Sequence, residues 1–192
     1  MQAEFVMSAP QPAGLRDLGL PEVAFVGRSN VGKSTLVGRL LKRPKLVRTS
    51  RTPGRTQLLN LFTDGRLAYV DLPGYGYAKL SKRDRARMQA LVYDYLALRR
   101  TLTGVVQILD ARRASVTDAD RETTAWILRA DRPLLVLMSK ADLVAKTHRL
   151  AQQRRVEKDL GLPPGVVLLC SGKTGEGLDE LRSRLDELCA RP

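Results

Sequence analysis

Short apolar runs alternate along the chain with longer segments in which apolar residues recur at helical spacing. Most runs are continuous rather than interrupted by polar residues, which is typical of parallel strands covered on both faces of a sheet. The predicted strands are 23–26, 58–62, 67–70, 105–109, 134–138 and 166–169. The predicted helices are 33–42, 82–100, 117–130, 147–160 and 177–190. This alternation predicts an α/β fold with a mainly parallel sheet.

Length and composition narrow the class of protein further. A chain of 192 residues can bury a core as one domain, and its 43% hydrophobic content argues against a disordered protein. No run approaches the roughly 18 apolar residues of a membrane-spanning helix. Residues 1–20 do not resemble a secretory signal, and we expect a flexible leader ahead of one domain over 21–192. Two cysteines are too few for a disulfide framework, so we expect a cytoplasmic protein, and we expect a monomer.

A candidate phosphate-binding loop follows the first predicted strand. Gly27-Arg-Ser-Asn-Val-Gly-Lys-Ser34 fits the pattern G-x-x-x-x-G-K-[ST]. The glycines allow backbone N–H groups to point at phosphate oxygens, Lys33 can reach the β and γ phosphates, and the Ser34 hydroxyl can ligate Mg²⁺. The helix predicted from Lys33 onward directs its positive end at the same place. A plain glycine turn would not need this strand–loop–helix context, so we interpret the loop as a nucleotide site.

Three further segments each follow a predicted strand. An acid at the start of Asp71-Leu-Pro-Gly74 can hold Mg²⁺ through water, while the Gly74 amide can sense a γ-phosphate. The carboxylate that ends Ser139-Lys-Ala-Asp142 can accept from two donors on the edge of guanine, a pair that adenine lacks. In Ser171-Gly-Lys173, the Gly172 amide can bind guanine O6. Each segment alone also fits an ordinary solvated loop, but together and in this order they favour a GTP-binding protein.

These segments resemble the phosphate, magnesium and guanine elements of TRAFAC-class small GTPases. Within that class, Thr49-Ser-Arg-Thr-Pro-Gly-Arg-Thr-Gln57 and Asp71-Leu-Pro-Gly-Tyr-Gly-Tyr-Ala-Lys79 resemble the EngB (YihA/YsxC) family of ribosome-biogenesis GTPases. Pro21-Glu22 and Asn30-Val31 fit the same family, and the resemblance covers about residues 21–190. It implies a Ras-like P-loop G domain, with a six-stranded, mostly parallel sheet flanked by about five helices.

The resemblance also implies roles for individual residues. The chain is expected to bind GTP and GDP with Mg²⁺, which Ser34 and Thr56 would ligate, Thr56 only when a γ-phosphate is present. Lys140 would pack along the guanine ring while Asp142 reads its edge. Lys33, Thr56 and Gly74 are candidate contacts to the transition state, and no residue is assigned as the catalytic group. The expected nucleotide-binding residues are Gly27, Arg28, Ser29, Asn30, Val31, Gly32, Lys33, Ser34, Thr35, Pro53, Gly54, Arg55, Thr56, Asp71, Leu72, Pro73, Gly74, Ser139, Lys140, Ala141, Asp142, Cys170, Ser171 and Gly172.

Three positions bear on activity. Tyr75 stands where Ras-like proteins place a glutamine that orients the attacking water, so we expect slow GTP hydrolysis, even beside the roughly 10⁻⁴ s⁻¹ of unassisted Ras-type enzymes. Ser139 stands where the family usually has threonine, and its hydroxyl can still bond to the phosphate loop. Asn30 resembles the asparagine that holds potassium in some related GTPases, which makes K⁺ a candidate activator.

Members of this family assist assembly of the large ribosomal subunit. The expected partner is therefore a precursor of that subunit, with its rRNA and ribosomal proteins, and a part in septation or cell division would follow from ribosome supply. The net charge of +13 is concentrated in residues 42–100, where fourteen basic residues face four acidic ones. Such a stretch attracts polyanions, although a merely solvated surface would have the same composition.

Two other classes of function stay open from the residues. A metabolic phosphotransferase could use the same phosphate loop, but it would have an acceptor pocket and a lid in place of a guanine-reading segment. A membrane-associated GTPase would need a spanning helix or a lipidation motif, and the residues that follow Cys189, Ala190-Arg191-Pro192, do not fit prenylation. We therefore expect no membrane partner.

Overall fold

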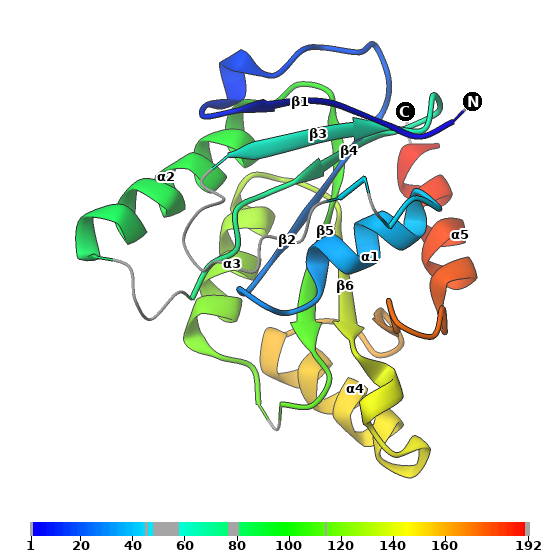
Figure 1. Cartoon of the computed structure of the whole chain (residues 1–192). Helices are drawn as coiled ribbons and strands as arrows, with labels where there is room; N and C mark the ends of the chain where they lie inside the picture. The colour runs from blue at the N-terminus through cyan, green and yellow to red at the C-terminus, as the bar shows by residue number, and fades with distance from the viewer. Residues whose placement is uncertain (1, 45, 48–57, 77–80, 114, 191–192) are drawn as a thin grey trace.

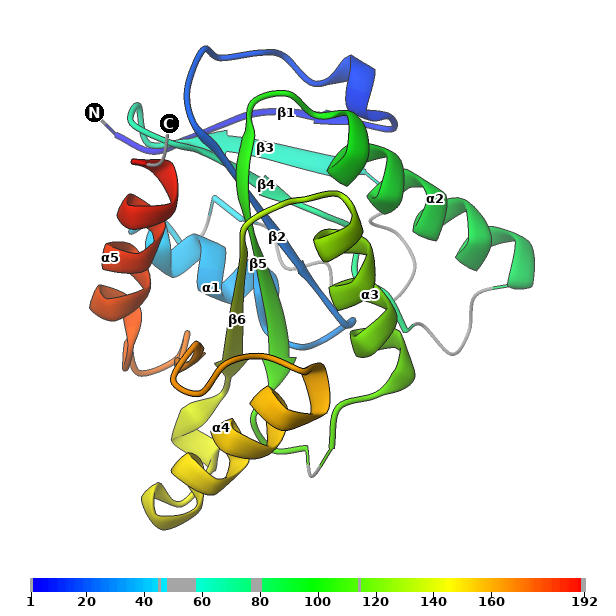
Figure 2. The same cartoon turned by 180° about the vertical axis from the view of Figure 1, so that it is seen from behind.

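The computed structural model describes residues 2–44, 46–47, 58–76, 81–113 and 115–190. Within them, a seven-stranded sheet lies between two layers of helices (Figure 1, Figure 2). The strands are β1 (Glu4–Ala9), β2 (Glu22–Gly27), β3 (Leu59–Thr63), β4 (Ala68–Asp71), β5 (Leu102–Asp110), β6 (Leu134–Ser139) and β7 (Val167–Leu169). The helices are α1 (Lys33–Leu40), α2 (Lys82–Leu98), α3 (Asp118–Arg129), α4 (Lys146–Leu160) and α5 (Leu178–Cys189), with short 3₁₀ helices η1 (Pro12–Gly14) and η2 (Ala141–Leu143). None of the helices in these residues has the length and apolar character needed to cross a membrane.

The strand order is β1-β3-β4-β2-β5-β6-β7, and β4, β2, β5, β6 and β7 pair in parallel. Strand β3 runs antiparallel to β4 on one side and to β1 on the other. The mainly parallel α/β sheet and the five flanking α-helices confirm the fold class expected from the sequence. The observed elements also begin and end within a few residues of the predicted ones.

Strand β2 shows why the central runs are continuously apolar. Val23 and Phe25 lie in one core cluster with residues of α1 and α5, whereas Ala24 and Val26 lie in a second with residues of α2 and α3. Since alternate side chains of a strand point to opposite faces, a strand covered on both faces is mostly apolar, and a polar side chain buried in it needs hydrogen-bond partners. The two layers of helices are visible in Figure 2, with α2 and α3 on the side opposite to α1 and α5.

Two expectations about the amino-terminal segment are wrong. The sheet has seven strands rather than six, and residues 1–20 are not simply a flexible leader, because β1 pairs with β3. Its side chains make specific contacts: Ser8 Oγ donates to Asn60 Oδ1 over 2.6 Å, and the rings of Phe5 and Phe62 lie edge to face at 5.5 Å. An edge strand has one neighbour and stays partly exposed, so β1 lacks the continuous apolar run that identified the other strands.

An ion pair fixes α2 at the end of the sheet remote from the strand carboxyl ends. The Arg99 guanidinium, just after α2, donates to both oxygens of the buried Glu22 carboxylate and to the carbonyls of Leu15 and Arg16. Tyr95 Oη donates to the same carboxylate over 2.5 Å. Burial, followed by the negative charge of Glu22, raises the pKa of the Tyr95 phenol well above its usual value. The carboxyl-terminal end of α2 is therefore tied to β2 and to the amino-terminal segment.

Candidate nucleotide-binding site

The predicted functional segments meet at one edge of the sheet. Residues 28–32 follow β2, Leu72–Gly74 follow β4, Lys140–Asp142 follow β6 and Cys170–Gly172 follow β7. These four strands run in parallel, so their carboxyl ends lie on the same side, where ligands bind in folds of this kind. The structure thus brings together segments that are more than a hundred residues apart in the chain.

The loop between β2 and α1 has the backbone of an anion-binding turn. Asn30 and Gly32 have φ angles of 62° and 98°, in the left-handed region. A Cβ atom on Gly27 would lie 2.6 Å from the carbonyl oxygen of Ile108, so only glycine fits there. Helix α1 begins at Lys33, and its free N–H groups and positive dipole end face this loop. The loop is therefore shaped for phosphate.

Lys33, Ser34 and Asp71 form a compact cluster beside the loop. Lys33 Nζ and Asp71 Oδ1 form a buried ion pair, and Ser34 Oγ donates to Asp71 Oδ2 over 3.0 Å. A hydroxyl and a carboxylate are hard oxygen ligands, which suit Mg²⁺ together with phosphate oxygens and water. Across the described part of the chain no group of three or more His, Cys, Asp or Glu could hold a metal. The cluster fits a metal that takes its other ligands from a nucleotide.

Gly74 lies against the backbone of the phosphate loop. A Cβ atom there would be 3.2 Å from the amide nitrogen of Ser29 and 3.3 Å from the carbonyl oxygen of Gly27. Just before it, the Leu72 N–H donates to the Phe25 carbonyl, and the Leu72 side chain is buried in the core. Of the residues expected near nucleotide, Leu72 therefore contributes backbone only. Pro53, Gly54, Arg55 and Thr56 lie outside the described residues.

The next residue, Tyr75, points away from the loop into the protein. The residue is 8% exposed, and its Oη donates to Asp120 Oδ1 of α3 over 2.8 Å. Burial is the main reason why the pKa of this phenol lies well above its usual value, and the Asp120 charge and hydrogen bond add to the effect. The phenol thus stays a proton donor to Asp120.

The segments after β6 and β7 are joined by hydrogen bonds. Ser139 Oγ lies 2.5 Å from the Val31 carbonyl of the phosphate loop, the contact expected of that hydroxyl. The Ala141 N–H donates to the Cys170 carbonyl over 3.1 Å. Ser171 Oγ donates to Asp142 Oδ1 over 2.6 Å and fixes one oxygen of that carboxylate. The Asp142 carboxylate is therefore oriented through one of its two oxygens.

Lys140 bridges the two halves of the site. Its Nζ donates to the Asn30 carbonyl over 2.7 Å and to Asp110 Oδ2 over 2.8 Å. Burial alone would raise the pKa of Asp110, but hydrogen bonds from Arg112 and Lys140 outweigh it and hold the pKa well below its usual range. Asp110 therefore stays ionised and keeps the Lys140 stem extended beside Gly32, whose added Cβ would lie 3.8 Å from Lys140 Cε.

Several residues that support the site could not be identified from the sequence. Asp110 of β5 and Asp120 of α3 are acids that belong to no recognised motif. Arg39 of α1 donates to the carbonyls of Gly172 and Lys173, and nothing in the sequence distinguishes it from a surface arginine. Conversely, the Cys170 thiol is fully buried, which raises its pKa to about 12, so only the backbone of Cys170 belongs to the site.

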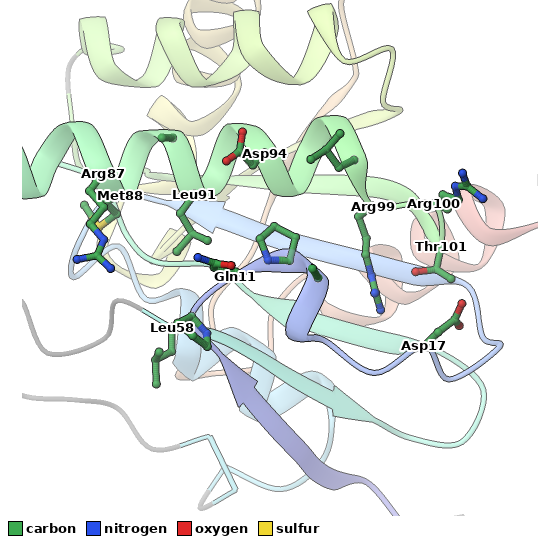
Figure 3. A pocket seen from close by; sticks show the side chains of 15 residues that line it. Gln11, Asp17, Leu58, Arg87, Met88, Leu91, Asp94, Arg99, Arg100 and Thr101 are labelled. Carbon is green, nitrogen blue, oxygen red and sulfur yellow. The ribbon is translucent and has the colours of Figure 1, made fainter.

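One prominent cavity of the described residues lies away from this site. Its volume is about 730 Å³. Figure 3 shows it between α2 and the segment around η1, with Leu58, Met88 and Leu91 among its lining side chains. A second cavity of about 370 Å³ borders the phosphate loop and is lined in part by Arg28 and Asp120. Convergent chemistry, rather than cavity size, identifies the functional site here.

Comparisons with known proteins agree with this chemistry. A family model described as "50S ribosome-binding GTPase" matches residues 22–140. The probable GTP-binding protein EngB of Desulfatibacillum aliphaticivorans is 48% identical over 97% of this chain and 91% of its own length. The protein of the same name from Geobacter sulfurreducens is 43% identical over 98% of this chain and 91% of its own length.

Solved structures agree on the fold. The crystal structure of a probable GTP-binding protein EngB superposes with a TM-score of 0.74 at 24% identity and covers 88% of this chain and 98% of that one. Era, solved with MgGDPNP and a piece of 16S ribosomal RNA, superposes with a TM-score of 0.73 at 24% identity over 90% of this chain and 58% of that one. With the fold, the four segments and the full-length relatives in agreement, this chain belongs to the EngB family of GTP-binding proteins, within the GTPase family whose model it matches.

Proposed function

We propose that this chain is a slow GTPase that serves as a nucleotide-dependent switch during assembly of the large ribosomal subunit. The observation that carries the proposal is that the Lys33–Asp71 pair and the Ser171–Asp142 pair lie at one edge of the sheet. The first pair suits phosphates with Mg²⁺, and the second suits the edge of guanine. We place this activity in the cytoplasm, where the free thiols of Cys170 and Cys189 would stay reduced, and in a monomer.

In this proposal the phosphates lie in the loop of Gly27–Thr35, with Lys33 beside the β and γ phosphates. Ser34 would ligate Mg²⁺ directly, Asp71 would act on it through water, and Thr56 would join when a γ-phosphate is present. Mg²⁺ neutralises negative charge on the phosphates when it is bound. The Lys140 stem covers the guanine ring, while Asp142 and the Gly172 amide read its edge. The Gly74 amide contacts the γ-phosphate and so distinguishes GTP from GDP.

Hydrolysis is expected to be slow because this chain presents no glutamine after Gly74. The Tyr75 phenol is engaged by Asp120 and cannot orient water from its position in the core. Lys33 and the loop amides remain to stabilise charge on the transferred phosphoryl group. A partner that supplies or positions a further group would be needed for fast turnover, and the ribosomal particle is the proposed partner.

The proposed partner surface is the basic amino-terminal half of α2. Lys82, Arg83, Arg85 and Arg87 are all exposed there. The only carboxylate among them is Asp84, which bonds the helix-capping Ser81. Because α2 follows the segment that contains Gly74, a change at the γ-phosphate can alter the direction in which this basic surface points. Precursor rRNA is a polyanion that such a surface would bind, and an effect on septation would then follow from ribosome supply.

Sedimentation with large-subunit precursor particles tests this function. We expect binding to be at least about tenfold tighter with a non-hydrolysable GTP analogue than with GDP, and to weaken steeply with salt because displaced counterions drive it. Changing the four basic residues of α2 to alanine should abolish the difference. The matched control is Arg182→Ala with Arg184→Ala on α5, where both arginines pair with neighbouring acids. Equal binding with both nucleotides would show that the basic residues of α2 have no nucleotide-dependent role in binding the particle.

We also propose K⁺ as a candidate activator through Asn30, whose carbonyl is engaged by Lys140. Turnover of GTP is then expected to be faster in KCl than in NaCl at equal ionic strength. Asn30→Ala should remove the difference without preventing nucleotide binding. Equal rates of the unaltered protein in the two salts would eliminate potassium from the proposal.

A further inference from the structure

We propose that Tyr75 is a positioning residue: its hydrogen bond to Asp120 holds Gly74 where the glycine amide meets the γ-phosphate, and thereby sets the preference for GTP over GDP. The inference rests on the proposed role of Gly74 and extends it. It assigns to Tyr75 a role that differs from the water-orienting glutamine whose place in the sequence it takes.

The backbone of Tyr75 is fastened to the phosphate loop on both sides. Its N–H donates to the Gly27 carbonyl over 3.2 Å, and its carbonyl accepts from the Ser29 N–H over 2.9 Å. Arg28 and Tyr75 form a parallel bridge outside the named strands. A displacement of Tyr75 would therefore move Gly74 relative to the loop that holds the phosphates.

The chain beyond Tyr75 is constrained as well. Gly76 has a φ angle of 77°, and a Cβ atom there would lie 3.0 Å from Arg28 Nε, because the Arg28 side chain crosses the chain at this glycine. The phosphate loop therefore contacts the chain both at the Tyr75 backbone and at Gly76. The Tyr75 side chain adds a third attachment, which runs to Asp120 of α3.

That third attachment is built to be rigid. Asp120 is 3% exposed and accepts from Tyr75 Oη through Oδ1. Its Oδ2 accepts from the Thr117 N–H over 3.0 Å and from Thr117 Oγ1 over 2.6 Å, in the capping box that begins α3. The carboxylate is therefore already oriented by the helix start, and the phenol bonds to a fixed acceptor. This arrangement gives Gly74 a defined position before nucleotide arrives, which lowers the ordering entropy that GTP binding must overcome.

Tyr95 is a matched control within the same protein. Its Oη also donates to a buried carboxylate, that of Glu22, but Glu22 begins β2 whereas the phosphate loop follows the end of β2. Tyr75→Phe and Tyr95→Phe each delete one buried hydroxyl and leave the ring in place. Both should lower thermal stability, whereas only the first alters the attachment of Gly74.

The test measures the dissociation constants of fluorescently labelled GDP and of a non-hydrolysable GTP analogue for each variant. We expect Tyr75→Phe to raise the dissociation constant of the GTP analogue by about three- to tenfold, which is the effect of losing one buried hydrogen bond. The dissociation constant of GDP should change by less than about twofold. Tyr95→Phe should leave both nucleotides within about twofold. The inference is overturned if Tyr75→Phe weakens both nucleotides equally, leaves both unchanged or tightens the GTP analogue.

Gly74→Ala separates this inference from the function on which it rests. Its Cβ would contact the Ser29 amide at 3.2 Å and shift the segment, so the GTP analogue should bind more weakly and GDP should not. If Gly74→Ala lowers the affinity for the analogue but Tyr75→Phe does not, the proposed role of Gly74 is supported and the proposed role of the Tyr75–Asp120 bond is refuted. If Gly74→Ala leaves the affinity for the analogue unchanged, the proposed roles of Gly74 and Tyr75 are both refuted.

Discussion

Replacing Asp142 with asparagine is expected to lower the affinity for GTP by on the order of 10³-fold and to make XTP the preferred nucleotide. The carboxylate accepts two charge-assisted hydrogen bonds from guanine in the proposed complex, and each is worth about 1.5–3 kcal/mol. Ser171 Oγ donates to Asp142 Oδ1, and the amide oxygen of asparagine can accept the same bond. The amide nitrogen would then face the base, where it suits the C2 carbonyl of xanthine and repels the amine of guanine.

Competition titrations with GTP, XTP and ATP measure this change. Ser171→Ala is the companion variant, since it removes the bond that orients the carboxylate and keeps the carboxylate itself. We expect that variant to lose about tenfold or less in GTP affinity and to retain guanine preference. An Asp142→Asn protein that still prefers GTP would refute the assignment of this segment to guanine. An ATP preference in the unaltered protein would favour a phosphotransferase instead.

Lys33→Ala is expected to weaken GTP binding by about 100-fold and also to destabilise the protein without ligand. The first effect follows from lost charge-assisted contacts to the phosphates. The second follows because Lys33 and Asp71 form a buried ion pair in the structure. Removing one partner of such a pair leaves an uncompensated charge and costs about 3 kcal/mol or more in the free energy of unfolding.

A double variant separates the two effects. Lys33→Ala combined with Asp71→Asn removes the unpaired charge, so urea unfolding should recover most of the lost stability, whereas calorimetry should show no recovery of GTP affinity. Lys158→Ala, an exposed lysine of α4, serves as the control for loss of a positive charge. Unchanged GTP affinity in Lys33→Ala would contradict the phosphate role of this lysine.

Features with a local chemical cause could be predicted from the sequence. The loop around Gly27 and Gly32 needs glycines because of close approach and a left-handed backbone, and these demands are visible as a motif. The strands of the sheet interior could be predicted because burial on both faces leaves few polar positions, so the strands appear as nearly continuous apolar runs. The segments that contain Gly74 and Asp142 could be placed at the same edge because parallel strands end together.

Features that depend on long-range partners could not be predicted from the sequence. The sequence indicated that Tyr75 lacks the chemistry of a glutamine, but not that its phenol bonds to Asp120, 45 residues away. Likewise, nothing local marks Asp110 as the residue that holds Lys140, because an acid at a strand end is equally stable in water. Contacts of this kind arise only when the sheet order is fixed, and a single sequence does not encode that order in any short pattern.

The edge strand β1 also bears on how the chain folds as it is synthesised. It is the first strand made, yet its only neighbour in the sheet is β3, and Ser8 pairs with Asn60 across 52 positions. The hairpin of β3 and β4 closes over a few residues, whereas β1 can pair with β3 only after a long loop has closed. During synthesis the first residues therefore stay unpaired until about a third of the protein has emerged. The strand at the edge of the sheet is thus the earliest in the chain, and its partner strand is made only after β2 and α1.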